Sequence, residues 1–298
     1  MKPNRLDGSD GMGETEEFSC SGLNLRGTMA GPVHGQPVFL LHGGGQTRYS
    51  WKRTQDLLAN AGFLAVAVDL RGHGESDWAS PDRYTLRDFA ADTRCLLERF
   101  ERPPAVIGAS LGGISTLLAV GEAPYAPLAA LVLVDIVPRI EEDGVKPITA
   151  FMRARPDGFA TVEEAADMVA AYLPHRPRPS DTSGLMKNLR RRTDGRLIWH
   201  WDPAYIDVAG LEESSDARAG RLEAAASRIS APTLLVRGLR SEVVTDEALK
   251  AFRAVMPEAA VVDIQDAAHM VAGDRNDIFG DAIMHFLGNI YQLRAQTE

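Results

Sequence analysis

Short apolar runs recur along the chain and predict the strands of a sheet. They are rich in Val, Ile and Leu and show no polar alternation, which is typical of strands buried on both faces of a parallel sheet. Helix-like stretches lie between most of them, for example over residues 51–62, 85–100 and 246–256. We therefore predict a doubly wound α/β domain. The apolar runs are 37–43, 63–70, 104–110, 128–137, 232–238 and 259–267.

One long segment breaks this alternation. Residues 138–228 contain no convincing buried strand, and their pattern is helical, most clearly over 161–173. Connections longer than about 12–15 residues usually carry structure or function of their own. We expect a helical cap inserted into a core domain that is formed by residues 17–137 and 229–298.

The two ends of the pattern are less regular. Residues 17–29 alternate loosely and predict an edge hairpin. Residues 1–16 are polar and acidic, and they predict a flexible tail without the apolar stretch of a signal peptide.

Composition narrows the class of partner. With 45% hydrophobic residues the chain can bury a substantial core, and its formal net charge is −9 with a pI near 5.3. Net negative charge disfavours binding to nucleic acid or to an anionic membrane. The apolar runs are far shorter than the roughly 20 residues of a membrane-spanning helix. We expect a cytoplasmic protein that acts on a small molecule, with no nucleic-acid or membrane partner.

The residues that usually bind metals show no pattern. Cys20 and Cys95 are too few for a disulfide framework, and no Cys/His spacing predicts a zinc site. The seven histidines include no H-E-x-x-H pair. We expect no metal and no cofactor.

A serine lies between two glycines where a predicted strand gives way to a helix. Ser110 stands in a G-x-S-x-G pattern, "GASLG". The small residues Gly108 and Gly112 relieve crowding while the serine adopts a strained turn that exposes its hydroxyl above the sheet. Backbone amides at the start of the next helix point toward that hydroxyl. We interpret Ser110 as a nucleophile rather than as a residue that merely caps the helix.

Two further motifs provide partners for this serine. "LLHGGGQT" places three glycines directly after the first strong strand, where bare backbone amides can approach an oxyanion. The amides of Gly44 and Leu111 are the candidate oxyanion donors. "DIQDAAHMV" places His269 after the last strand, at the sheet edge where Ser110 also lies. His269 would take the Ser110 proton and later return it.

Four motifs in order resemble those of α/β-hydrolase-fold serine hydrolases: "LLHGGGQT", "DLRGHGESD", "IGASLGG" and "DAAHMV". Together they extend from about residue 37 to 285. The resemblance implies a mostly parallel sheet of the eight-stranded type, with a cap between the sixth and seventh strands that shapes the substrate pocket. It also implies an architectural role for the loop that contains His73.

The acid of the triad stays open between two carboxylates. The resemblance implies an acid after the seventh strand, where Glu242 lies four residues past Gly238. Some members of the family draw the acid from the sixth strand, and Asp135 lies at the end of that strand. Either carboxylate can orient His269 and stabilise its imidazolium. We expect Glu242 to be the acid, with Asp135 as the alternative.

A serine with a base and an oxyanion hole predicts acyl transfer through a covalent acyl-enzyme that water then hydrolyses. The substrate class is an ester, a lactone or an activated carbon–carbon bond, and a carboxylesterase-like enzyme is the first expectation. Gly43, Trp199, Trp201 and Tyr205 are the candidate pocket residues, and the aromatic ones favour a hydrophobic substrate. The alternative is a cofactor-free oxygenase or a non-catalytic ligand-binding protein on the same fold.

Overall fold

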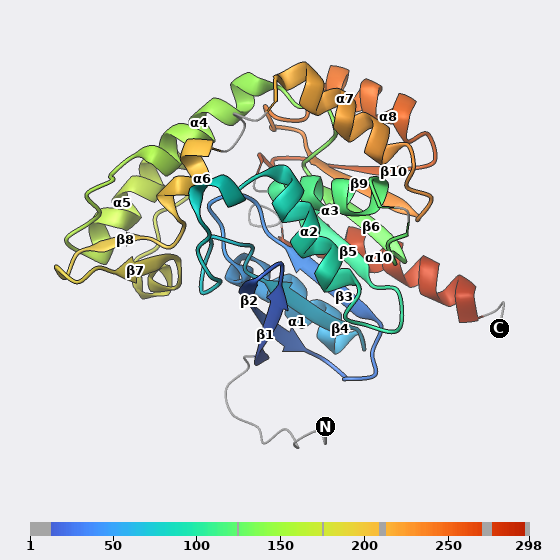
Figure 1. Cartoon of the computed structure of the whole chain (residues 1–298), viewed down its shortest axis with the longest axis horizontal. Helices are drawn as coiled ribbons and strands as arrows, with labels where there is room; N and C mark the ends of the chain where they lie inside the picture. The colour runs from blue at the N-terminus through green and yellow to red at the C-terminus, as the bar shows by residue number, and fades with distance from the viewer. Residues whose placement is uncertain (1–12, 124, 175, 209–212, 270–275, 296–298) are drawn as a thin grey trace.

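The computed structural model describes residues 13–123, 125–174, 176–208, 213–269 and 276–295 (Figure 1). Within them, eight strands form one sheet in the order β1-β2-β4-β3-β5-β6-β9-β10. β1 and β2 form an antiparallel hairpin at one edge, β2 pairs antiparallel with β4, and the remaining pairs are parallel. The mostly parallel α/β sheet predicted from the sequence is confirmed. The strands are β1 Glu14–Cys20, β2 Leu23–Ala30, β3 Pro37–Leu41, β4 Leu64–Val68, β5 Ala105–Ala109, β6 Ala130–Val134, β9 Thr233–Gly238 and β10 Ala260–Ile264.

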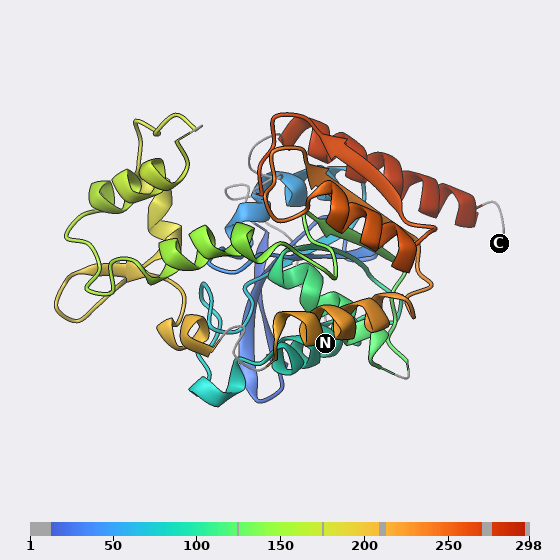
Figure 2. The same ribbon diagram turned by 90° about the horizontal axis from the view of Figure 1, so that it is seen from above.

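The central strands carry apolar residues at every position because both faces of the sheet are covered. In β3, Val38 and Leu40 join the apolar cluster on one face, whereas Phe39 and Leu41 join the cluster on the other. Helices α1 and α10 pack on the first face, and α2, α3, α7 and α8 pack on the second (Figures 1 and 2). These helices are α1 Lys52–Asn60, α2 Leu86–Leu97, α3 Leu111–Gly121, α7 Ser215–Ala226, α8 Asp246–Val255 and α10 Asn276–Ala295.

Between β6 and β9 the chain leaves the sheet and forms a separate lobe, which we call the insertion (residues 138–208; Figures 1 and 2). Its apolar core includes Phe159, Trp199 and Trp201. The insertion also holds two short antiparallel strands, where the sequence predicted helices alone. Its elements are α4 Glu142–Arg153, α5 Val162–Tyr172, β7 Leu189–Arg191, β8 Leu197–Trp199 and α6 Pro203–Val208, and a 3-10 helix spans Ser183–Asn188.

Helix α7 belongs with the main domain, although the expected cap extended to residue 228. It packs against α3, and its residues Leu222, Ala225 and Ala226 are part of the main apolar cluster. The contact is close, because a Cβ on Gly121 of α3 would lie 2.1 Å from the Ala225 carbonyl oxygen. The lobe that stands apart from the sheet is therefore shorter than the predicted cap.

The N-terminal hairpin differs from the expectation in two ways. β1 begins at Glu14, so residues 14–16 belong to the sheet rather than to a tail, and residues 1–12 lie outside the described residues. Cys20 in β1 and Cys95 in α2 form a disulfide, with their Cα atoms 5.7 Å apart. The pair is 75 residues apart in the sequence, and the packing of α2 on β1 brings it together.

In the part of the chain that the structure describes, no helix combines the length and the apolar character needed to span a bilayer.

Candidate active site

Ser110 lies at the junction of β5 and α3 in a strained backbone conformation. Its φ of 44° falls in the left-handed region, which costs a residue with a Cβ roughly 1–3 kcal/mol. The flanking glycines leave no room for a side chain. A Cβ on Gly108 would lie 2.7 Å from Gly112 and Gly113 backbone atoms, and one on Gly112 would lie 2.3 Å from the Leu41 carbonyl oxygen. The local geometry is that of a nucleophile elbow.

The backbone of Ser110 is held in place while its hydroxyl is left uncommitted. The Ser110 amide donates to the Val134 carbonyl (3.4 Å), and the Ser110 carbonyl accepts from the Ile114 amide (2.9 Å). Among the described residues, neither the Ser110 hydroxyl nor the Leu111 amide has a hydrogen-bond partner. Free amides are normal in the first turn of a helix, which is also its electropositive end. A partly exposed hydroxyl therefore lies beside a free N–H group.

The glycine-rich loop after β3 lies against this elbow. A Cβ on Gly43 would lie 3.2 Å from the Ser110 Cβ. The Gly43 amide donates to Gln46 Oε1 (3.0 Å), and the Gly45 amide donates to His73 Nε2 (3.1 Å). Of the three glycine amides, that of Gly44 has no partner within the described residues. The two amides named as oxyanion donors, those of Gly44 and Leu111, are therefore both free to receive a ligand.

His269 contacts Asp135, not the preferred acid Glu242. Its Nδ1 lies 2.8 Å from Asp135 Oδ2. Asp135 is fully buried, and its carboxylate also accepts hydrogen bonds from the Gly238 amide (3.0 Å) and the Ser241 hydroxyl (2.5 Å). Glu242 is exposed to solvent. The geometry replaces Glu242 by the alternative, Asp135, as the carboxylate that orients the histidine.

Strand pairing explains why Ser110 and Asp135 are neighbours. β5 and β6 run in parallel with Ala109 opposite Val134, so the next residue of each strand leaves the same edge of the sheet. Neighbouring strands are about 4.8 Å apart. β9 and β10 continue the sheet from β6, and His269 follows β10 at that same edge. Side chains distant in sequence therefore converge at the carboxyl ends of the strands.

Ser241 was not recognised in the sequence. It occupies the loop after β9 in which the acid was expected, and its hydroxyl donates to Asp135 while it accepts from the Val243 amide (3.1 Å). The signal was weak, because a lone serine in a loop is common. The loop that contains Glu242 therefore supports the carboxylate of Asp135 through Ser241.

Two buried histidines support the glycine-rich loop from outside. The His73 Nε2 accepts from the Gly45 amide, and the His200 Nε2 lies 3.4 Å from the Gly45 carbonyl oxygen, to which it donates. The His200 Nδ1 accepts from the Gly74 amide (2.7 Å). Burial lowers the pKa of His73 to about 3 and that of His200 well below its ordinary value, so both rings are neutral near pH 7. His200 comes from the insertion.

The insertion is attached to the core at a second point beside His200. The Asp202 amide donates to the Gly72 carbonyl (2.8 Å), and the Asp202 carboxylate accepts from the Tyr84 hydroxyl (2.6 Å). Burial is the main cause that raises the pKa of Tyr84, and the hydrogen bond to this carboxylate raises it further. These bonds join the start of α6 to the loop after β4.

Only one of the three predicted pocket aromatics lies against the glycine-rich loop. The rings of Trp199 and Trp201 stack with their centroids 5.0 Å apart and pack with Phe151 inside the insertion, where they stabilise the lobe. Tyr205, in contrast, lies against the glycine-rich loop: a Cβ on Gly44 would be 2.8 Å from its hydroxyl oxygen.

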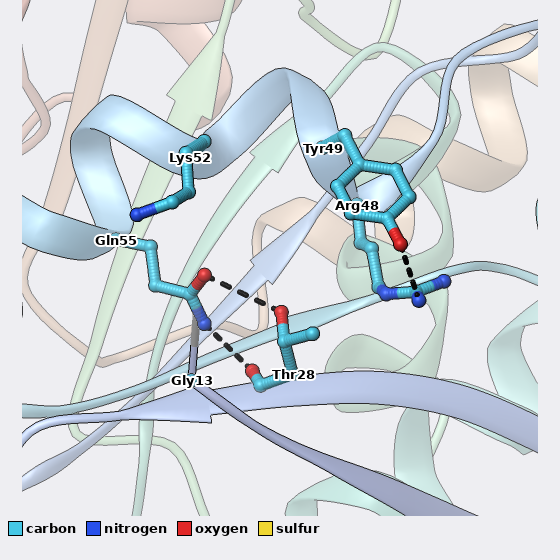
Figure 3. A pocket seen from close by; sticks show the side chains of 6 residues that line it. All are labelled: Gly13, Thr28, Arg48, Tyr49, Lys52 and Gln55. Atoms are coloured by element: carbon cyan, nitrogen blue, oxygen red, sulfur yellow. Dashed lines mark hydrogen bonds between the residues drawn. The ribbon is translucent and has the colours of Figure 1, made fainter. Parts of the chain in front are cut away.

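The described residues include no metal cluster, and one small cavity lies away from the candidate catalytic residues. Within the described residues, no group of three or more His, Cys, Asp or Glu side chains could hold a metal ion. A cavity of about 10 Å³ lies between β2 and the start of α1 (Figure 3), which is room for about one water molecule. None of the candidate catalytic residues lines it. Its walls are formed by Gly13, Thr28, Arg48, Tyr49, Lys52 and Gln55.

Two proteins whose sequences are similar to this chain are hydrolases. The chain is 33% identical over 223 residues to an esterase of Mycobacterium tuberculosis. The aligned region covers 70% of this chain and 68% of that protein. It is 26% identical over 246 residues to a 2-(acetamidomethylene)succinate hydrolase of Mesorhizobium japonicum. This alignment covers 76% of this chain and 78% of that protein. These relatives support an enzyme of the hydrolase type.

The fold agrees with solved structures. The crystal structure of E-2-(acetamidomethylene)succinate hydrolase superposes with a TM-score of 0.79 at 23% identity, covering 92% of this chain and 99% of that one. The family model described as alpha/beta hydrolase fold matches residues 36–275. The chain therefore belongs to the α/β hydrolase fold family.

Proposed function

We propose that the protein is a serine hydrolase that cleaves a small, hydrophobic substrate through an acyl-enzyme. In this proposal Ser110 is the nucleophile, His269 the general base and Asp135 the acid. One observation carries it: the Nδ1 of His269 is hydrogen-bonded to a buried carboxylate at the strand end beside Ser110. A histidine held in this way is oriented for proton transfer, and a binding protein would gain nothing from it.

The hydrogen bond sets the tautomer of the base. With Nδ1–H donated to Asp135, the Nε2 of His269 carries a lone pair that can accept the Ser110 proton. Ser110 Oγ then bonds to the substrate carbonyl carbon, and the carbonyl oxygen becomes an oxyanion that the Gly44 and Leu111 amides stabilise. His269 returns the proton to the leaving group. Water, deprotonated by His269, releases the acid and regenerates the serine.

We propose a carboxylic ester as the first substrate class, ahead of a lactone or an activated carbon–carbon bond. A relative that is 33% identical to this chain is an esterase. The glycine-rich loop is lined by Tyr205 beside Gly44 and by the Met152 side chain beside Gly45, and these apolar neighbours favour an apolar acyl group.

The first test is covalent labelling of the serine. A fluorophosphonate probe should add once to the wild-type protein and not to Ser110→Ala, as measured by intact-protein mass spectrometry. A panel of p-nitrophenyl esters with increasing acyl length should be hydrolysed by the wild type alone. A folded wild type without an adduct would refute the proposal. Oxygen consumption that survives Ser110→Ala would favour the oxygenase alternative instead.

A further inference from the structure

Tyr205 belongs to the insertion, but the main domain holds its ring. It lies in α6, and its ring centroid is 4.9 Å from that of His73, 5.7 Å from Phe89 and 6.0 Å from Tyr84. The side chain is partly buried and packs against both apolar clusters, that of the core and that of the insertion. These contacts on several sides fix the direction in which the hydroxyl points.

The Tyr205 hydroxyl has no hydrogen-bond partner among the described residues, although buried tyrosine hydroxyls usually have one. The neighbouring Tyr84 illustrates the usual case, because its hydroxyl donates to Asp202 and accepts from the Ala79 amide (2.9 Å). The Tyr205 hydroxyl points instead at Gly44, where a Cβ would lie 2.8 Å from its oxygen. A free donor therefore stands beside the free Gly44 amide.

The two donors are close enough to serve one acceptor. From the geometry of Gly44, the Tyr205 oxygen is at most about 5.3 Å from the Gly44 nitrogen. Two donors that each lie about 2.9 Å from a shared oxygen can be up to about 5.8 Å apart. Burial raises the pKa of Tyr205 to about 12, so the hydroxyl keeps its proton at neutral pH.

We propose that Tyr205 is a third oxyanion donor, whose hydroxyl binds the same substrate oxygen as the Gly44 and Leu111 amides. This inference rests on the proposed serine-hydrolase function and deepens it. The insertion then supplies a catalytic group in addition to the walls of a pocket.

The variant Tyr205→Phe removes the hydroxyl and keeps the ring contacts. With p-nitrophenyl butyrate, kcat should fall about 100- to 1,000-fold, the range for loss of one oxyanion donor. KM should stay nearly constant, because the bond strengthens in the transition state. As a control, Tyr125→Phe removes the hydroxyl of a tyrosine that is 78% exposed and precedes β6, at the sheet edge opposite Ser110. It should keep the wild-type kcat.

A trifluoromethyl ketone inhibitor provides a readout that does not depend on turnover. Ser110 Oγ adds to its carbonyl carbon, the proton passes to His269, and the carbonyl oxygen becomes a bound oxyanion. Tyr205→Phe should raise the inhibition constant by about the same factor as it lowers kcat. An increase in KM alone, with kcat and inhibitor affinity unchanged, would make Tyr205 a simple pocket contact and overturn the inference.

The position of the hydroxyl can be tested without any substrate. In Gly44→Ala the new methyl group would meet the Tyr205 hydroxyl, whereas the next nearest atoms of that ring are 3.6 and 3.7 Å away, at ordinary contact distance. Gly44→Ala should therefore lower the melting temperature less in the Tyr205→Phe background than in the wild type. Equal losses in both backgrounds would place the hydroxyl elsewhere and reject the inference.

Failure of the two proposals can be told apart. A wild type that neither reacts with the fluorophosphonate nor hydrolyses esters rejects the serine hydrolase and the Tyr205 role together. An active wild type whose Tyr205→Phe variant retains kcat and inhibitor affinity rejects the Tyr205 role alone.

Discussion

Replacing Asp135 by Asn removes one buried negative charge and leaves the shape of the side chain almost unchanged. Asp135 has a φ of 48°, a left-handed conformation that asparagine tolerates better than most residues. An asparagine oxygen can still accept from the Gly238 amide, as Asp135 Oδ1 does. The fold should therefore survive, and any effect should come from the loss of the carboxylate.

The contacts of the second carboxylate oxygen set the size of the effect. Asp135 Oδ2 accepts from both His269 Nδ1 and the Ser241 hydroxyl. An amide NH₂ at that position donates, so His269 must turn its Nδ1 into an acceptor and carry its proton on Nε2. The base then has no lone pair for the Ser110 proton. In the serine-protease template this change costs about 10⁴ in kcat, and we expect a loss of about 10³–10⁴, or roughly 4–5.5 kcal/mol of activation free energy.

The assay is steady-state hydrolysis of p-nitrophenyl butyrate, with melting temperatures measured in parallel. Asp266→Asn is the matched control, because Asp266 also has a left-handed backbone (φ 60°), but its side chain is 60% exposed and pairs with Arg240. Glu242→Gln tests the acid preferred from sequence. If Asp135→Asn stays within tenfold of the wild type and Glu242→Gln is inactive, the acid belongs to the loop after β9 and our reasoning is wrong.

Three further predictions concern the fold around the site. Gly112→Ala should lower the free energy of unfolding by about 3 kcal/mol or more in urea titrations, because its Cβ would lie 2.3 Å from a carbonyl oxygen of β3; an unchanged midpoint would contradict the tight elbow. Burial lowers the pKa of His42 to about 4 and that of His73 to about 3, against about 6.5 in the unfolded chain. The unfolded state therefore binds more protons than the folded state below about pH 6.5. The stability present above that pH should be lost as pH falls toward 4, by up to about 1.4 kcal/mol per pH unit for each histidine. Equal melting temperatures at pH 8 and pH 5 would contradict this. The unreduced, denatured protein should show no titratable thiol, and two free thiols would contradict the disulfide. The double variant Cys20→Ser, Cys95→Ser should melt at a lower temperature, because the disulfide closes a loop of 75 residues, which is worth up to about 4.5 kcal/mol of chain entropy.

The sequence predicts the core strands because burial on both faces requires apolar residues at every position. Ser110 and His269 could be named because each follows a predicted strand at the same edge of the sheet. Their local signals, two glycines around a serine and a histidine after the last strand, do not depend on side-chain direction.

The acid could not be predicted in this way. Glu242 and Asp135 both follow strands at the same edge, and which one meets His269 depends on the left-handed turn at Asp135 and on the hydroxyl of Ser241. The disulfide and strands β7 and β8 were missed for similar reasons. Only the packing of α2 on β1 brings the two cysteines close to each other, and no local sequence signal marks that contact. Strands β7 and β8 are each three residues long, which is too short to show a hydrophobic period.

The bonds that His200 and Asp202 make with the main domain bear on how this enzyme can be redesigned. A lobe transplanted from another hydrolase would leave the Gly74 amide and the Gly72 carbonyl without partners, at roughly 1–3 kcal/mol for each orphaned buried group. Lobe exchange would therefore also weaken the loop after β4, whose His73 accepts a hydrogen bond from the Gly45 amide. Libraries that keep residues 200–205 constant and vary α4 and α5 would separate selectivity from rate.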